Sequence, residues 1–183
     1  QKKESETGAT SIDNGNNVKF LLCGLNFPDN PSLLKHLNIW TGDTGATVDS
    51  TPYENRMINV RNAKKCEGIQ VGNGTLEKTV KIGDIRGNIC DKAGKMCDAI
   101  MMKDVNVVPG NKYNMFSIMQ RQQRGWQLGG DKKLIWLTKG GKKVTFDIKI
   151  HTPKGVVYAM YIKRNGEAGY SRIDKTMDIQ QNH

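Results

Sequence analysis

The chain has 183 residues, of which 37% are hydrophobic and 25% are charged, and its formal net charge is +10. That length fits one domain with an appendage and allows a sizeable core. No apolar run approaches the ~20 residues of a membrane-spanning helix, and the polar N-terminal stretch is no signal peptide, so we expect an intracellular, cytoplasmic protein with no membrane partner.

The cysteines do not predict a metal site. Cys23, Cys66, Cys90 and Cys97 are irregularly spaced, without a Cys-x2-Cys pair, and the histidines lie far from them in the sequence. We therefore expect free thiols in a reducing compartment, no metal and no cofactor.

The positive charge is compatible with a nucleic-acid partner, but this partner has weak support. The lysines are scattered, no run of five basic residues occurs, and neither a zinc knuckle nor an RNA-binding aromatic motif is visible. Solvated strand faces explain most of these lysines.

The N-terminal part of the chain divides into a polar leader and an apolar start. Residues 1–17 are rich in Ser, Thr, Asn, Gly and charge, a composition that predicts disorder. Val18–Phe27 is the first apolar run and is short enough for a strand. A second apolar stretch, Leu37–Trp40, leads into Asp43 and predicts another strand.

The tetrapeptide Asp43-Thr44-Gly45-Ala46 follows this apolar stretch directly. Asp, Thr and Gly after a short strand are typical of the active-site loop of aspartic proteases. Asp43 is the member able to act as a general acid or base, Thr44 offers a hydroxyl, and Gly45 lets a second backbone approach closely. The alternative is an ordinary turn, because the same residue types are common turn formers.

The middle of the chain predicts strands, a hairpin and one helix. Gly72-Asn73-Gly74 lies between β-prone segments, and Asn-Gly in that context predicts a hairpin turn. Ala99–Val108 is expected to be a strand that ends at a Pro-Gly pair. Tyr113–Gln123 carries apolar residues at helical spacing and ends before a glycine, so it predicts a helix.

The last third returns to β patterns. Leu134–Thr138 and Lys143–Ile150 flank Gly140-Gly141, and the second segment alternates strictly between apolar and polar residues. Val156–Lys163 is apolar on both faces. We expect residues 126–164 to form a sheet of their own or to extend the preceding one, and residues 165–183 to be a polar tail.

Three ordered segments resemble a retropepsin, and more closely the protease region of copia-type retrotransposon Gag-Pol polyproteins, running into the segment before the integrase. They are Trp40–Thr47, Val71–Gly74 and Lys103–Ile118. The resemblance implies a mainly β fold: a retropepsin-like closed β-barrel with one short helix over residues 18–125, followed by a β-meander over residues 126–164.

The resemblance also implies an activity. An aspartic endopeptidase needs two carboxylates that share a proton. The sequence has only one Asp-[Ser/Thr]-Gly, so a homodimer would supply Asp43 from each chain. Gly72, Asn73 and Gly74 would form the flap tip, and a polyprotein would be the substrate, cut inside a virus-like particle if the element is active. Where copia-type sequences often carry His, this chain has Asp49. The alternative is a catalytically inactive retroelement-derived structural or nucleic-acid-binding module.

Overall fold

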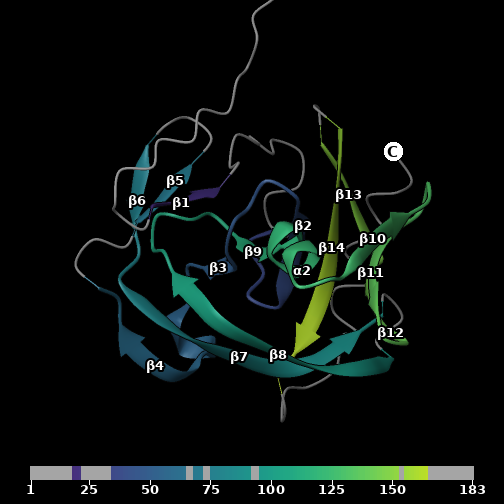
Figure 1. Cartoon of the computed structure of the whole chain (residues 1–183), viewed down its shortest axis with the longest axis horizontal. Coiled ribbons are helices and arrows are strands. Elements are labelled where there is room, and N and C mark those ends of the chain that lie inside the picture. Colours follow the sequence, from purple (N-terminus) through teal and green to yellow (C-terminus); the bar gives the residue numbers. More distant parts are fainter. Residues whose placement is uncertain are drawn as a thin grey trace, which may run out of the picture.

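The computed structural model describes residues 18–21, 34–64, 68–71, 75–91, 95–152 and 155–164. Within these ranges the chain is mainly β, as expected. Helix α2 spans Ile118–Gln123, and a 3-10 turn, η1, spans Glu54–Arg56. Figure 1 shows strands curving around the middle of the molecule, with α2 near the centre of the view.

The largest sheet has the strand order β13-β14-β2-β9-β3-β8-β7-β4. Its strands, in chain order, are β2 (Ile39–Asp43), β3 (Ser50–Thr51), β4 (Ile58–Asn62), β7 (Lys81–Cys90), β8 (Met96–Val107), β9 (Asn114–Ser117), β13 (Ile148–Thr152) and β14 (Gly155–Lys163). Because β14 also pairs with β7, the strands from β14 through β2, β9, β3 and β8 to β7 close into a ring. The result is a barrel-like arrangement.

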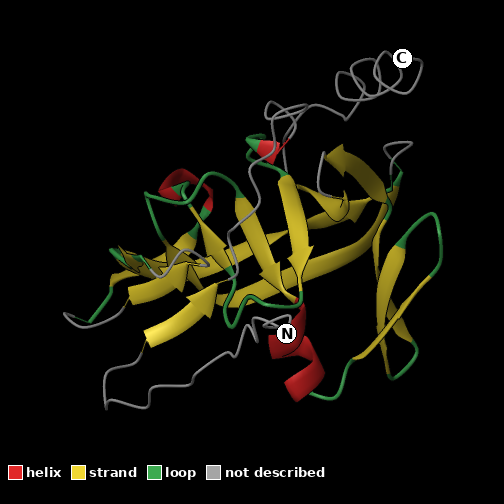
Figure 2. Cartoon of the chain, turned by 90° about the horizontal axis from the view of Figure 1, so that it is seen from above, coloured by secondary structure: helices red, strands yellow, loops and turns green. Residues whose placement is uncertain are grey.

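Two smaller sheets accompany this barrel. One has the order β1-β5-β6, built from β1 (Val18–Leu21), β5 (Gly68–Val71) and β6 (Leu76–Lys78). The other is an antiparallel meander of β10 (Gln127–Gly130), β11 (Ile135–Lys139) and β12 (Lys142–Phe146). The meander lies at the right of both views, beside the barrel (Figures 1 and 2).

Strand β14 has buried apolar residues on both faces, as its sequence predicts. Ala159 and Tyr161 join one core cluster, whereas Met160 and Ile162 join the other. Its antiparallel partner on one side is β2, and on the other side are β13 and, further along, β7. A strand with a core on each side reads as a continuous apolar run, which explains why Val156–Lys163 does not alternate.

A buried asparagine fixes the centre of the barrel. Asn114 begins β9 and is fully buried. Its amide Nδ2 donates to the carbonyl oxygen of Ile39 at 2.8 Å, and its Oδ1 accepts from Thr51 Oγ1 at 2.7 Å. The carbonyl oxygen of Asn114 accepts from Thr41 Oγ1 at 2.9 Å. One residue thereby ties β2, β3 and β9 together through satisfied polar groups, as a buried polar side chain requires.

Two sequence predictions are corrected here. The helix expected over Tyr113–Gln123 starts only at Ile118, because Asn114–Ser117 pairs in parallel with β2 as strand β9. The single strand expected over Lys143–Ile150 is interrupted at Asp147 and supplies two different sheets, through β12 and β13. Both errors arise because pairing with strands distant in sequence outweighs the local pattern.

The predicted hairpin around residues 72–74 is seen only through its flanks. Strands β5 and β6 pair antiparallel, with Gln70 opposite Leu76. Gly72, Asn73 and Gly74 lie outside the described residues, as do the leader (1–17) and the tail (165–183).

Candidate functional site

Asp43 is the last residue of β2, which lies between two strands. Antiparallel β14 contacts it at Trp40, opposite Met160, and parallel β9 contacts it at Asp43, opposite Ser117. The strand is buried up to Thr41, and Asp43 at its end is only partly buried. The predicted apolar approach to Asp43 is therefore a central strand, which fixes the carboxylate from behind.

The carboxylate of Asp43 is held by the turn that follows it. Its Oδ1 accepts from the backbone N–H of Gly45 at 2.7 Å. Burial raises the pKa of Asp43 above 3.8, while hydrogen bonds from the amides of Gly45 and Ala46 act in the opposite direction. A carboxyl group that keeps its proton to higher pH is suited to general acid–base chemistry. Thr44 is exposed at this turn, whereas Ala46 is fully buried.

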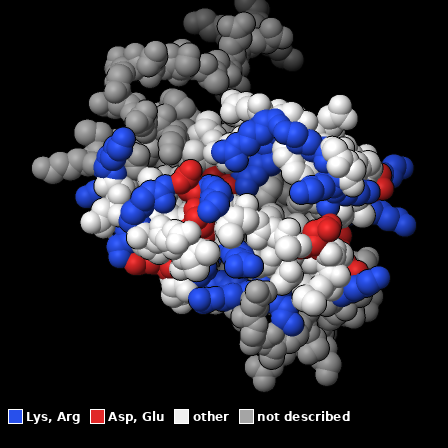
Figure 3. Space-filling model, turned by 60° about the horizontal axis from the view of Figure 1, so that its bottom comes forward, with Lys and Arg blue, Asp and Glu red and all other residues white. Residues whose placement is uncertain are grey.

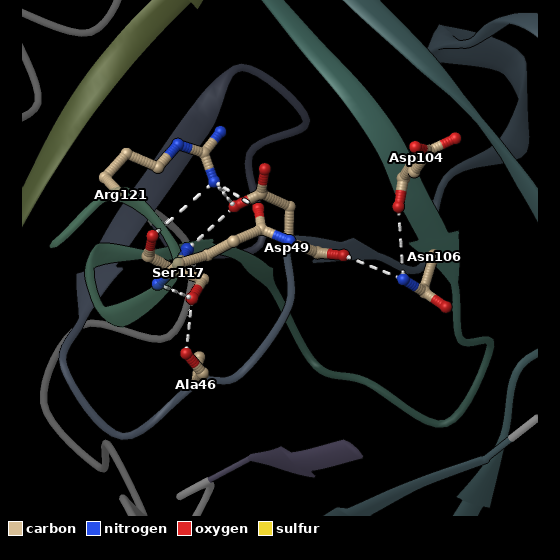
Figure 4. Close-up of polar contacts among 7 residues, drawn as sticks. Ala46, Asp49, Asp104, Asn106, Ser117 and Arg121 are labelled. Atoms are coloured by element: carbon tan, nitrogen blue, oxygen red, sulfur yellow. Dashed lines mark hydrogen bonds and ion pairs between the residues drawn. The ribbon is translucent and has the colours of Figure 1, made fainter. Parts of the chain in front are cut away.

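One serine links this loop to helix α2 (Figure 4). Ser117 Oγ donates to the carbonyl oxygen of Ala46. The same oxygen accepts from the backbone N–H of Gln120 at 3.0 Å, which makes Ser117 the N-cap of α2. The position of the Asp43 loop is thus coupled to the start of the helix.

A buried ion pair closes the other side of the loop (Figure 4). Asp49 Oδ1 accepts from Arg121 Nη1 at 2.6 Å and from the Ser117 N–H at 2.8 Å. The Asp49 side chain is 1% exposed and that of Arg121 10% exposed. Burial raises the pKa of Asp49, and the charge and hydrogen bonds of Arg121, with the Ser117 amide, act against it. The guanidinium also lies 3.9 Å from the ring centre of Phe116.

The meander supports the strand behind the loop. A Cβ at Gly42 would lie 3.0 Å from a ring carbon of Phe146 in β12 and 3.1 Å from Cδ1 of Ile118 in α2. The rings of Phe146 and Phe116 meet edge to face, with centroids 5.4 Å apart. Gly42 therefore lets an aromatic side chain from β12 pack directly against the residue before Asp43.

The structure places Asp43, Thr44, Gly45 and Ala46 in one loop. The predicted flap, residues 72–74, lies outside the described residues.

Sequence reasoning missed the supporting residues Asp49, Ser117 and Arg121. A sequence signal did exist for the first of them, because Asp49 replaces a His frequent in the resembled proteins. Arg121, however, reads as a solvated helix residue.

Two further findings concern the described residues alone. No group of three or more His, Cys, Asp or Glu side chains there is arranged to hold a metal ion. No helix in the same ranges is long and apolar enough to cross a membrane.

Residues 40–126, slightly less than half of the chain, match the family model described as "Pol polyprotein, beta-barrel domain". Neither a curated protein nor a solved structure is found to match. The matched range starts inside β2 and ends just after α2, so it contains the Asp43 loop, the barrel strands up to β9 and the Asp49–Arg121 pair. This match supports a region of a retroelement Gag-Pol polyprotein.

Proposed function

We propose that the chain is an aspartic endopeptidase of a copia-type retroelement polyprotein. The observation that carries the proposal is the state of Asp43. Its carboxylate lies at the end of a central strand, in an Asp-Thr-Gly-Ala loop, bound by the Gly45 amide and with a pKa raised by burial. The match of residues 40–126 to a Pol polyprotein domain supports the same source.

In the proposed mechanism two copies of the chain meet with their Asp43 carboxyl groups facing each other. The ionised one takes a proton from water that attacks the scissile carbonyl carbon, and the protonated one donates to the carbonyl oxygen. Two such groups about 3 Å apart cannot both ionise, so the pair titrates as a unit. A C2 dimer is the simplest way to bring one motif into such a pair. Residues 72–74 would then act as flaps over the peptide substrate.

The test is cleavage of a peptide library by the purified chain, read by mass spectrometry, with and without pepstatin. We expect specific cleavage that pepstatin blocks and that Asp43→Asn abolishes while the melting temperature stays close to that of the parent. Asp98→Asn is the matched control, because Asp98 is exposed on β8 and away from the loop. Cleavage that survives in pure Asp43→Asn protein would refute the protease assignment.

The dimer has its own test. Specific activity should fall on dilution, in parallel with dissociation measured by analytical ultracentrifugation, because each chain supplies one carboxylate. A fully active monomer would require a second catalytic acid within one chain. A folded dimer without cleavage or pepstatin binding would instead favour the alternative of a catalytically inactive structural module.

A further inference from the structure

Positive charge is concentrated around the β10-β11-β12 meander. Residues 124–149 contain seven Lys and Arg and two Asp, a net of +5, against +10 for the whole chain. The seven cations are Arg124, Lys132, Lys133, Lys139, Lys142, Lys143 and Lys149. None of them forms a salt bridge with a carboxylate in the described part of the chain. Six are exposed and Lys149 is half-buried.

One of the two acidic residues of this stretch has a structural role in a turn. Asp131 Oδ1 accepts from the backbone amides of Lys133 and Leu134, at 2.6 and 3.0 Å, so it shapes the turn between β10 and β11. Figure 3 shows one face of the molecule on which Lys and Arg side chains clearly outnumber the scattered acidic ones. A surface with this imbalance attracts polyanions.

The two faces of the meander differ in chemistry. One face carries Leu137 and Phe146, both fully buried, together with Val144 and Ile135, which pack against the core. The strand register places polar residues and one aromatic residue on the other face, which we call the outer face: Gln127, Thr138 and Lys143 in one row, and Gly129, Trp136 and Thr145 in the next. The outer face thus offers hydrogen-bonding groups around a single indole.

The Trp136 side chain packs against Gly129 on the outer face. It lies opposite Gly129, where an added Cβ would be 2.6 Å from the indole Nε1, so only glycine leaves room for the ring. Lys143 Nζ lies 4.6 Å from the ring centroid. The side chain remains half-buried. A rigid indole beside a lysine offers both a stacking surface and a phosphate partner.

The remaining cations lie at the ends of the meander. Lys139 and Lys142 are paired across the Gly140-Gly141 turn, on the same side of the strands as Leu137 and Val144, and Lys139 Nζ donates to the backbone carbonyl oxygen of Arg124. At the opposite end, Lys149 Nζ donates to the carbonyl oxygen of Lys132 at 3.0 Å. The strand Ile135–Lys139 between these ends covers about 13 Å. Cations therefore lie at both ends of the meander, and Lys143 lies beside Trp136 on the outer face.

We propose that this outer face binds single-stranded nucleic acid, with lysines on the phosphates and a base stacked on Trp136. The stacked base takes the place of the Lys143 ammonium over the ring, and the ammonium moves to the adjoining phosphate. A single strand fits because its bases are free to stack, whereas a duplex hides their faces. This binding is independent of the proposed protease activity, because none of its residues belongs to the Asp43 loop.

The test uses the whole chain and fluorescein-labelled oligonucleotides, roughly 12 nucleotides long. Oligo-U, oligo-dT and a mixed-sequence duplex are titrated by fluorescence anisotropy between about 50 and 200 mM salt. We expect both single strands to bind more tightly than the duplex. If oligo-U binds more tightly than oligo-dT, the 2′-hydroxyl contributes to recognition; equal affinity identifies phosphate and base as the groups recognised.

Two variants separate stacking from charge. Trp136→Ala should weaken single-strand binding about 5- to 100-fold, with Trp136→Phe close to the parent. Lys142→Gln/Lys143→Gln should reduce the slope of log K against log salt by about 1.4 for a single strand. The control with the same loss of charge is Lys95→Gln/Lys112→Gln, two exposed lysines outside the meander, which should leave the slope unchanged.

Three outcomes would overturn the proposal. The first is no single-strand binding at about 50 mM salt. The second is an equal loss in the two double-lysine variants, which would mean diffuse charge attraction. The third is unchanged binding by Trp136→Ala protein whose circular dichroism matches the parent. Heparin binding that is unchanged in Trp136→Ala but weaker in Lys142→Gln/Lys143→Gln would support the proposal, because heparin has charge but no bases to stack.

Discussion

Two buried aspartates, Asp49 just before strand β3 and Asp84 in strand β7, have pKa values shifted in opposite directions. Asp49 lies behind the Asp43 loop, in the group of Asp49, Ser117 and Arg121 that we call the junction. Its carboxylate accepts from Arg121 and from the Ser117 amide, and burial raises its pKa. Asp84 lies in the ribbon of β4, β7 and β8, and its pKa is lowered to about 2. Both residues are aspartates with little exposed surface, so the groups around each carboxylate must cause the opposite pKa shifts.

The ribbon gives Asp84 several donors close to solvent. Its carboxylate accepts from Asn59 Nδ2 at 2.9 Å, from Lys103 Nζ at 2.8 Å and from the Asp104 N–H at 3.2 Å. Lys103 is 56% exposed, so its charge stays hydrated while it contacts the carboxylate. Such donors favour the ionised form of Asp84. In the junction, by contrast, both partners of the ion pair have lost water, and Asp49 Oδ2 has no hydrogen-bond partner among the described residues.

Asp84 also holds two backbone irregularities in place. Asn59 and Asp104 have φ values of 52° and 58°, in the left-handed region that non-glycine residues rarely adopt. The register shifts beside Asp84 on both of its neighbouring strands. The ribbon aspartate therefore stabilises bulges, whereas the junction aspartate joins a loop to a helix.

The largest expected effect tests whether the junction depends on packing from the meander. Phe146→Asp should prevent stable folding, because it removes about 3–5 kcal/mol of aromatic packing and places a carboxylate in an apolar core. Expression, solubility and thermal melting provide the measurement. Thr145→Asp, on the outer face of the same strand, is the control and should fold. A soluble Phe146→Asp protein that melts like the parent would show that β12 does not support the barrel.

The next prediction breaks the junction ion pair. Arg121→Met should lower the free energy of unfolding by about 3–5 kcal/mol, because it leaves the Asp49 carboxylate buried without its cation. Adding Asp49→Asn should recover part of this loss, since the amide oxygen can still accept from the Ser117 N–H. Urea unfolding of both variants measures the coupling, with exposed Arg86→Met as the control. Purely additive losses would mean that the pair is not coupled.

A smaller effect is expected in the ribbon. Asp84→Asn should cost about 1–3 kcal/mol, because it weakens the charged hydrogen bonds to Lys103 and Asn59. Lys103→Met should cost less than about 1 kcal/mol, since that side chain is mostly solvated. Both are measured by urea unfolding. If Lys103→Met lowered the free energy of unfolding more than Asp84→Asn does, the lysine, and not the support of the two bulges, would be the main contribution to the stability of the ribbon.

The mildest perturbation is pH, and the two aspartates should respond with opposite signs. The folded-state pKa of Asp84 is lowered from 3.8 to about 2, so its stabilisation is complete above pH 3.8 and is lost as pH falls toward 2. The folded-state pKa of Asp49 is raised, so its contribution instead decreases as pH rises from 3.8 through that pKa.

Urea midpoints between pH 2 and 7 should therefore fall less steeply on the acid side in Asp84→Asn than in the parent. In Asp49→Asn, the decrease in the urea midpoint that Asp49 causes above pH 3.8 should be absent. Acid profiles that are the same in Asp84→Asn and the parent would contradict the assignment of the lowered pKa to Asp84.

The sequence by itself determined the local features of this protein. The apolar stretch before Asp43 is strand β2, and the two-sided apolar run of Val156–Lys163 is strand β14. The strict alternation of Val144, Phe146, Ile148 and Ile150 correctly predicts that these four residues pack against apolar cores, although they lie in two strands and two core clusters. These predictions work because the spacing of apolar residues along a short stretch of chain indicates which of its faces is buried.

Only the tertiary structure decided the rest. Asn114–Ser117 is a strand because it pairs with β2, more than 70 residues earlier, although its own spacing is helical. The same pairing places Ser117 beside Asp49 and brings Arg121, 72 residues away in sequence, onto its carboxylate. Partners of buried charges are chosen by the whole fold, because an unpaired buried charge costs far more free energy than any local preference supplies.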